Sequence, residues 1–269
     1  MHLYYANEMG YEAIIDYKNY SNFYKEKEKI NNTLNSWEYY FKQPTRTPLE
    51  EVYKSKNVIL SKANVSHELA SQHSLEDLND IGFIGNEKLI SEYYLITESI
   101  KLNQDTNNFV SETLNKVFTN KTKTLGVVLR GTDYLNKKLS RGHHTPLNVI
   151  DSIELVENNL QKWNLDYVYL STEVEEYINI YKDHFGENLM YLVRDRYNND
   201  QNEKLINQYT RSRKNDKYLT GLEYLTEVYG LSKCDSIIGT VCGSLNSAII
   251  LNNNKYNNKI IYDQGKNFE

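Results

Sequence analysis

Cysteine and proline are scarce in this chain, which has two cysteines and three prolines among 269 residues. Cys234 and Cys242 have neither the spacing of a zinc site nor that of a redox pair, so both are expected to be reduced thiols of a cytoplasmic protein. No apolar run approaches the roughly 20 residues of a membrane span, and no signal peptide opens the chain. A net charge of −5 argues against nucleic acid or an anionic membrane as a partner.

Several motifs of nucleotide-binding and hydrolytic enzymes are also missing. The chain has no GK[ST] ending of a P-loop and no GxGxxG fingerprint, and nothing supports a serine hydrolase. It has no DxD pattern, so it lacks the usual motif for binding a sugar nucleotide through a divalent metal ion. We therefore expect no metal site and no bound cofactor.

What the chain does have, from about residue 122 onward, is a regular alternation of strand and helix signals. Helix-start signals occur at Thr145-Pro146 and, with capping-box spacing, at Thr172 with Glu175 and Thr220 with Glu223. Such alternation predicts an α/β fold with a parallel, doubly wound sheet. The predicted strands cover 125–130, 167–171, 189–193, 236–240 and 259–263.

The first half has weaker signals. Strands are predicted over 12–17 and 58–60, and helices from 74 and over 87–103 and 108–119. A basic, polar stretch at 120–124 suggests two domains, residues 1–121 and 122–269. The chain begins as though already inside the first helix of a doubly wound domain, so the first strand is expected to be lost or truncated.

The most informative segment is 125–134, where an apolar strand runs into Arg130, Gly131, Thr132 and Asp133. Ligands of open α/β sheets bind at the carboxyl ends of the strands. An arginine there can hold a phosphate with two parallel N–H donors. The alternative is a surface Arg130–Asp133 pair that closes a turn.

Two more candidates follow the same logic. His143 and His144 precede the predicted helix start, where one of them could relay a proton or donate to a phosphate, unless both are simply exposed loop residues. Glu173 follows the strand 167–171 and could bind a sugar or a basic partner, although an ordinary acid at a helix N-terminus is the simpler interpretation.

The turn at 239–244 follows another predicted strand and contains Gly239, Thr240, Gly243 and Ser244. Its backbone N–H groups at a helix start suit a diphosphate, and a tight strand-to-helix connection is the alternative.

Glu227 lies beside the apolar stripe of a predicted helix over 220–233, where a buried carboxylate needs a donor. A guanine edge, ribose hydroxyls or an internal arginine or lysine could each supply one.

Four segments together resemble a known family: GVVLRGTD at 126–133, HHTP at 143–146, YVYLSTE at 167–173 and the block at 220–248. They are similar, in order and spacing, to the α1,6-fucosyltransferases and the rhizobial nodulation fucosyltransferase, and more distantly to the protein O-fucosyltransferases. The resemblance covers essentially the second half. It implies a GT-B-like fold of two Rossmann-like domains with parallel sheets, here with an incomplete N-terminal one, and metal-independent, inverting transfer from GDP-fucose.

The resemblance also implies roles for individual residues. Arg130 matches the arginine that binds the donor diphosphate, Glu227 the acid that holds the nucleoside, and Ser244 a hydroxyl near the phosphates. Together with the readings above, the predicted catalytic residues are Arg130, Asp133 and His144, and the predicted donor-binding residues are Arg130, Glu173, Glu227, Thr240, Gly243 and Ser244.

Three positions depart from the family pattern. Val128 stands where the family has a histidine, Gly131 replaces a second arginine, and Lys138 stands where the family offers a glutamate as candidate base. These departures affect base recognition, the charge at the diphosphate and the identity of the proton acceptor.

The sequence therefore predicts a glycosyltransferase that moves fucose from GDP-fucose to a glycan acceptor in bacterial surface polysaccharide synthesis. The alternatives are a non-catalytic relative that binds a nucleotide or glycan, and a transferase with another GDP- or UDP-sugar.

Overall fold

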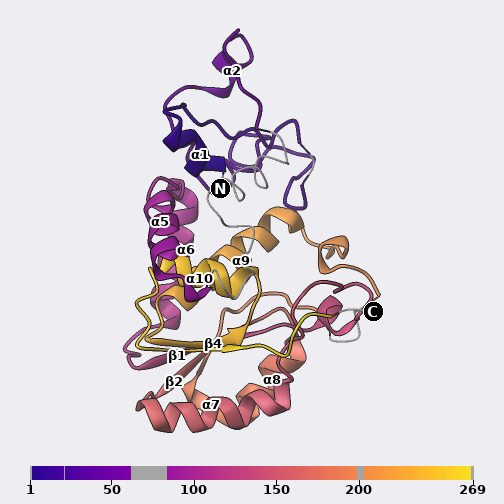
Figure 1. The fold of residues 1–269 in the computed structure, drawn as a ribbon. Coiled ribbons are helices and arrows are strands. Elements are labelled where there is room, and N and C mark those ends of the chain that lie inside the picture. Colours follow the sequence, from indigo (N-terminus) through magenta and orange to yellow (C-terminus); the bar gives the residue numbers. More distant parts are fainter. Residues whose placement is uncertain (1, 21, 62–83, 199–202, 268–269) are drawn as a thin grey trace. The chain divides into compact units, whose positions relative to one another are not determined.

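The computed structural model describes residues 2–20, 22–61, 84–198 and 203–267 (Figure 1). The chain divides into two compact units, Met1–Asn107 and Asn108–Glu269. No helix among the described residues is long and apolar enough to cross a membrane.

The second unit is built on a five-stranded sheet in which every neighbouring pair is parallel, in the order β3-β2-β1-β4-β5. The central strand β1 is buried over its whole length, as expected for an apolar strand in a sheet covered on both faces. This confirms the predicted α/β class and the parallel sheet. The strands are β1 (Thr124–Leu129), β2 (Tyr167–Thr172), β3 (Leu189–Met190), β4 (Ser236–Thr240) and β5 (Asn258–Tyr262).

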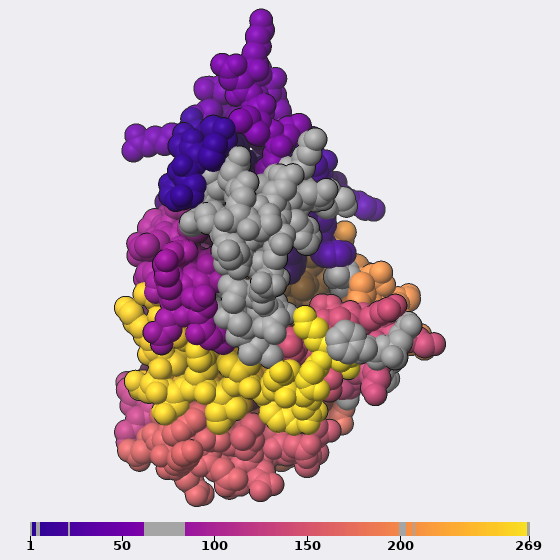
Figure 2. Space-filling model, in the orientation of Figure 1, coloured from indigo at the N-terminus to yellow at the C-terminus, as the bar shows by residue number. Residues whose placement is uncertain are grey.

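Helices cover both faces of this sheet. α7 (Val149–Trp163) and α8 (Glu175–Phe185) lie on one face, and α9 (Asp216–Ser232) and α10 (Gly243–Leu251) lie on the other (Figure 1). The inner side chains of α7 and α8 share one apolar core with β1 and β2. In the space-filling view, α7 and α8 form the outer layer of this unit, next to its C-terminal residues (Figure 2). The arrangement is doubly wound, and it places the strand-to-helix turns at the carboxyl edge of the sheet.

Gly230 allows α9 to approach β2 closely. A Cβ at this position would overlap the ring of Tyr169, whose side chain is fully buried. The Tyr169 hydroxyl is buried with no hydrogen-bond partner among the described residues, and burial raises its pKa well above the usual value.

Strands form in all five predicted places, although the one predicted over 189–193 covers only Leu189–Met190. The three helix starts predicted in the second half are wrong. α7 begins at Val149 rather than at Thr145, because Asn148 caps it by accepting hydrogen bonds from the N–H groups of Ile150 and Asp151. α8 begins at Glu175 after an uncapped Val174, and α9 begins at Asp216, which places Thr220 inside the helix. In both cases the capping-box spacing coincides with a helix that starts elsewhere.

The first unit contains helices and turns but no strand among its described residues. Its helices are α1 (His2–Glu8), α2 (Leu49–Val52) and α5 (Glu87–Thr97), and α6 (Gln104–Val117) starts within it. The helices predicted over 87–103 and 108–119 therefore exist with shifted ends, and the one predicted from 74 lies outside the described residues.

The strand predicted over 12–17 does not form, for a visible reason. The side-chain amide of Gln43 accepts from Ile15 N at 2.9 Å and donates to Ile15 O at 2.9 Å. The side chain of Asn35 accepts from Tyr17 N at 2.9 Å. Side chains thus take the backbone groups that a neighbouring strand would use. The second predicted strand, 58–60, is also absent, since its side chains are exposed.

Candidate functional site

Arg130 follows the buried strand β1 and lies at the carboxyl edge of the sheet. Its side chain is 15% exposed and faces Asp133 at 3.6 Å and Glu173 at 3.4 Å. Its guanidinium lies 4.3 Å from the centre of the Tyr134 ring. The predicted surface pair with Asp133 is thus part of a more buried group that also contains Glu173.

The two acids organise the loop that carries Arg130. Glu173 accepts a hydrogen bond from Gly131 N at 2.7 Å, and Asp133 accepts one from Ile206 N at 3.2 Å. Thr132 donates to Asp133 at 3.1 Å and adopts a φ of 48°, a conformation that costs energy for a β-branched residue. These contacts hold the loop in a shape that its sequence does not favour locally.

Arg130 keeps its positive charge in this setting. Burial alone would lower its pKa, but Glu173, Tyr134, Cys242 and Asp133 raise it above the usual value. Its Nε is buried without a hydrogen-bond partner among the described residues, and its ion pairs, at 3.4 and 3.6 Å, are longer than ordinary charge-assisted hydrogen bonds. A permanent cation with unused donors at this edge is chemically suited to an oxyanion.

The turn from β4 to α10 lies next to Arg130. Cys242 precedes the first residue of α10 and is near enough to Arg130 to influence its pKa. Burial raises the pKa of the Cys242 thiol. The predicted residues of this turn have separate roles: Thr240 accepts from Leu147 N at 2.9 Å, and Ser244 contacts the Tyr224 hydroxyl at 3.4 Å. Gly243 is exposed at the helix start, where backbone N–H groups attract anions.

The two histidines have different environments. His144 is buried, and its Nδ1 lies 3.0 Å from the carboxylate of Asp263. Hydrogen bonds from Gly265 N and His144 lower the pKa of Asp263, so this carboxylate is ionised and orients the imidazole. His143 is exposed and packs on Tyr134, with ring centres 5.1 Å apart. His144 thus contacts Asp263, whereas Arg130 faces Asp133 and Glu173.

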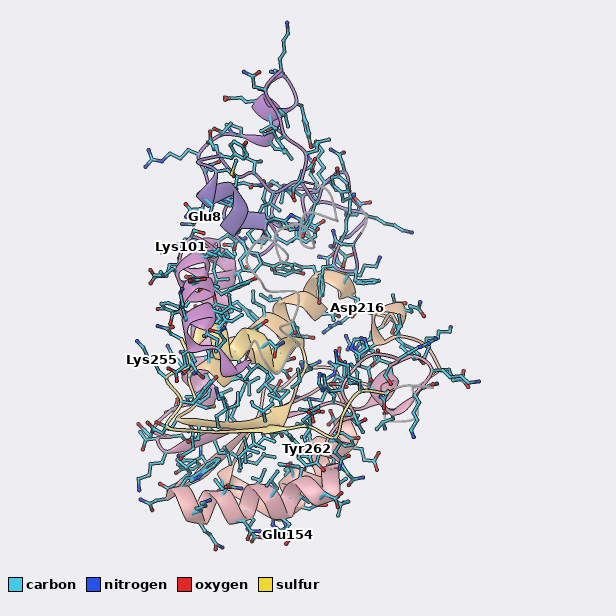
Figure 3. All side chains as sticks on the ribbon, in the orientation of Figure 1. Glu8, Lys101, Glu154, Asp216, Lys255 and Tyr262 are labelled. Carbon is cyan, nitrogen blue, oxygen red and sulfur yellow. The ribbon has the colours of Figure 1, made fainter. Side chains whose placement is uncertain are left out.

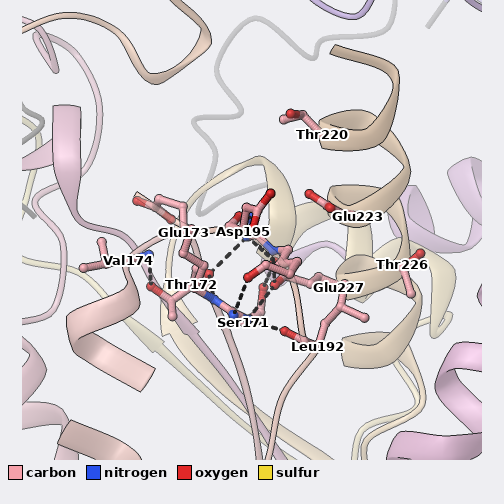
Figure 4. Close-up of polar contacts among 12 residues, drawn as sticks. Ser171, Thr172, Glu173, Val174, Leu192, Asp195, Thr220, Glu223, Thr226 and Glu227 are labelled. Carbon is pink, nitrogen blue, oxygen red and sulfur yellow. Dashed lines mark hydrogen bonds and ion pairs between the residues drawn. The ribbon is translucent and has the colours of Figure 1, made fainter. Parts of the chain in front are cut away.

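Glu227 has its donors inside the protein. Its side chain is 3% exposed and accepts from Arg194 Nε at 2.8 Å and Nη2 at 3.0 Å. Ser171 donates to it at 3.2 Å (Figure 4), and Arg196 faces it at 3.5 Å. Of the donors expected from the sequence, an internal arginine is the one observed. A nucleoside would have to share this carboxylate.

A set of four arginines between β3 and α9 was missed by the sequence reasoning. Arg194 and Arg196 bind the end of β2 and Glu227, while Arg211 and Arg213 contact Asp216 at the start of α9. The signal was present as four arginines in a segment of twenty residues that carries no strong helix or strand pattern. We name residues 194–213 the arginine segment.

Metal ligands do not cluster within the part of the chain that the structure describes. No group of three or more His, Cys, Asp or Glu side chains there is placed to hold an ion.

Comparison with known proteins gives a match only at the level of structure. No protein-family model matches, and no curated protein matches in sequence. The selenomethionine structure of the fucosyltransferase NodZ from Bradyrhizobium has a TM-score of 0.53 and 12% identity, over 98% of this chain and 89% of NodZ. NodZ α-1,6-fucosyltransferase soaked with GDP-fucose has a TM-score of 0.52 and 12% identity, over 92% of this chain and 84% of NodZ.

The chain shares its fold with NodZ. This confirms the resemblance in fold to the fucosyltransferases and the GT-B-like fold class expected from the sequence motifs. POFUT1 in complex with GDP-fucose is more distant, with a TM-score of 0.37 and 10% identity over 66% of this chain and 50% of POFUT1.

On this fucosyltransferase fold, the three departures occupy distinct places. Val128 is buried within the sheet, where it pairs with Gly239 of β4. Gly131 is buried and uses its N–H on Glu173. Lys138 is exposed in the loop after β1.

Proposed function

We propose that the chain is a glycosyltransferase that takes a GDP-sugar, most simply GDP-fucose, at the carboxyl edge of the sheet in residues 122–269. The observation that carries this proposal is Arg130, a buried cation with unused donors directly after β1 in a fucosyltransferase fold. The adjacent start of α10, at Gly243 and Ser244, adds backbone N–H groups and the positive end of a helix dipole.

The proposed reaction is inverting and needs no metal. Arg130 and the start of α10 would offset the charge that builds on the departing diphosphate, which is usually the largest electrostatic contribution to catalysis. The acceptor hydroxyl would attack the oxocarbenium-like sugar from the opposite face and lose its proton to a base. His144 is our candidate for the base, because Asp263 orients it and the oxygens of Asp133 already accept from Thr132 and Ile206.

The remaining predicted residues take supporting roles in this proposal. Glu173 holds the Arg130 loop through Gly131 N, and Thr240 holds the segment before α7 through Leu147 N. Glu227 would contact the nucleoside only while bound to Arg194. We assign the glycan acceptor to the N-terminal domain, residues 1–121, and the setting to cytoplasmic synthesis of a bacterial surface polysaccharide.

Donor binding and hydrolysis test this function. Ligands that bind only the folded state stabilise it by about 2.7 kcal/mol at a hundredfold excess over Kd. GDP and GDP-fucose should raise the unfolding midpoint without added metal, UDP and CMP should not, and GDP-fucose should be hydrolysed slowly. A chain that is stabilised by none of these nucleotides would contradict the proposal.

A second candidate is a non-catalytic binder of nucleotides or glycans. It is favoured by the two carboxylates that face Arg130 and by the exposed Lys138 where the family has its candidate base. Stabilisation by GDP-fucose without any hydrolysis or transfer would support this candidate. Stabilisation by UDP-sugars instead of GDP-sugars would indicate a transferase with a different donor.

A further inference from the structure

The arginine segment carries four guanidinium groups, and in three of them the edge formed by Nε and Nη2 is hydrogen-bonded within the protein. A guanidinium presents Nε and Nη2 as a fork that matches a carboxylate or phosphate. In three arginines both atoms of this fork donate to protein acceptors: Arg194 to Glu227, Arg196 to the carbonyls of Thr172 and Leu192, and Arg213 to Asp216 and Glu223. These three arginines therefore have a structural role.

Arg211 differs from the other three. Its Nε and Nη2 are both buried, and neither has a hydrogen-bond partner among the described residues. Its Nη1 donates to Thr220 at 3.0 Å and to Asp216 at 3.3 Å, and its guanidinium lies 4.1 Å from the centre of the Tyr197 ring. The Arg211 side chain is thus held through Nη1 and through the ring of Tyr197, while Nε and Nη2 have no hydrogen-bond partner among the described residues.

Backbone contacts connect the arginine segment to the Arg130 loop. Tyr197 N donates to Glu173 O at 2.9 Å, and Ile206 N donates to Asp133 at 3.2 Å. Glu173 and Asp133 are the two acids that face Arg130. Arg211 therefore belongs to a segment anchored to the loop that carries Arg130, whose Nε is also buried and has no hydrogen-bond partner in the described parts of the chain.

We propose that Arg211 binds a phosphoryl oxygen of the nucleotide donor through its Nε/Nη2 fork. The proposal rests on the function proposed above, and it supplies a second arginine for the diphosphate in place of the one lost at Gly131. Unsatisfied buried donors are rare and costly, so their pairing with a phosphoryl oxygen stabilises the complex. A ligand reaches the fork only if neighbouring side chains move, and this pairing favours that movement.

Calorimetric titration with inorganic pyrophosphate, GDP and guanosine tests the assignment. Arg211→Met should weaken pyrophosphate and GDP roughly tenfold to hundredfold, the range for a hydrogen bond to a charged group, and should leave guanosine unchanged. Arg211→Lys, which keeps the charge but not the fork, should fall between Met and the wild type. The exposed neighbour Lys214 provides the control, and Lys214→Met should bind all three like the wild type.

Other outcomes overturn the assignment. They are wild-type affinity for pyrophosphate and GDP in Arg211→Met, an equal loss for guanosine, or a wild-type chain that binds neither phosphate ligand. If Arg211→Met does not fold, Arg211→Lys decides on the same criteria. If the wild type shows no sugar transfer but binds pyrophosphate in an Arg211-dependent way, the transferase proposal fails and the phosphate site stands.

Discussion

Replacement of Glu227 by glutamine should destabilise the second unit severely. The glutamate and its partners Arg194 and Arg196 have side chains that are only 3%, 7% and 2% exposed. Glu227→Gln keeps the size of the side chain but removes the anion from between two buried cations. Loss of one partner of a buried ion pair typically costs about 3–5 kcal/mol, because the remaining charge is left uncompensated. We expect a loss of this size in the free energy of unfolding.

Urea denaturation followed by circular dichroism measures this loss as a shift in midpoint at an unchanged slope. Glu154→Gln on the exposed side of α7 is the matched control (Figure 3) and should stay within about 0.5 kcal/mol of the wild type. Replacing both Glu227 and Arg194 by methionine should restore part of the loss, since apolar substitutes for a buried pair are often tolerated. A Glu227→Gln protein within about 1 kcal/mol of the wild type would refute the reasoning.

Three further predictions concern other parts of the second unit. Gly230→Ala should lower the free energy of unfolding by about 1–3 kcal/mol, because the added methyl group overpacks against Tyr169. Adding Tyr169→Phe removes the hydroxyl, which has no hydrogen-bond partner among the described residues, and should recover part of this loss in urea denaturation. Additive effects of the two substitutions would contradict the packing account. Burial alone would raise the pKa of Asp216, but hydrogen bonds from Arg211 N and the Arg213 side chain hold this pKa below its usual value. The ionised carboxylate therefore stabilises the folded state above pH ~4, and this contribution is lost as the pH falls through the folded-state pKa. Asp216→Asn should therefore flatten the acid limb of a stability–pH curve, and an unchanged curve would count against this role. His144→Asn should lower sugar transfer by about a hundredfold or more with GDP affinity unchanged, whereas the exposed His143→Asn should remain active; equal activities would exclude His144 as the base.

The sheet of the second unit could be predicted from the sequence because each of its strands is a short apolar run between helices. A run such as 125–129 has few alternatives once it must be buried on both faces. The helix starts were less predictable. Thr145-Pro146 has the composition of a helix start, but Asn148 makes the capping bonds, and only the structure shows which side chain reaches the free N–H groups.

The first unit shows where sequence patterns fail. The sequence of 12–17 suits a strand that ends in an acid, yet a strand also needs a neighbour with free backbone groups. Gln43 and Asn35 bind those groups instead, and both are distant in sequence. No local pattern contains this information.

The candidate site was predictable where chemistry follows a strand, as at Arg130 and Glu173. The part of the site that depends on the long connection between β3 and α9 was not predictable. The described residues of the arginine segment form little regular structure, so its arginines could not be assigned to the sheet edge from periodicity. Only the fold shows that Arg194 contacts Glu227, and that the Nε and Nη2 atoms of Arg211 have no hydrogen-bond partner among the residues described.

The most direct test of the account is the binding of GDP-fucose to the wild type and to Arg130→Ala by calorimetry without added metal. The account predicts binding by the wild type and a loss of roughly tenfold to hundredfold in Arg130→Ala, the range for a charged hydrogen bond, with the circular dichroism spectrum unchanged. Equal affinity in a folded Arg130→Ala protein would contradict a donor site built on Arg130.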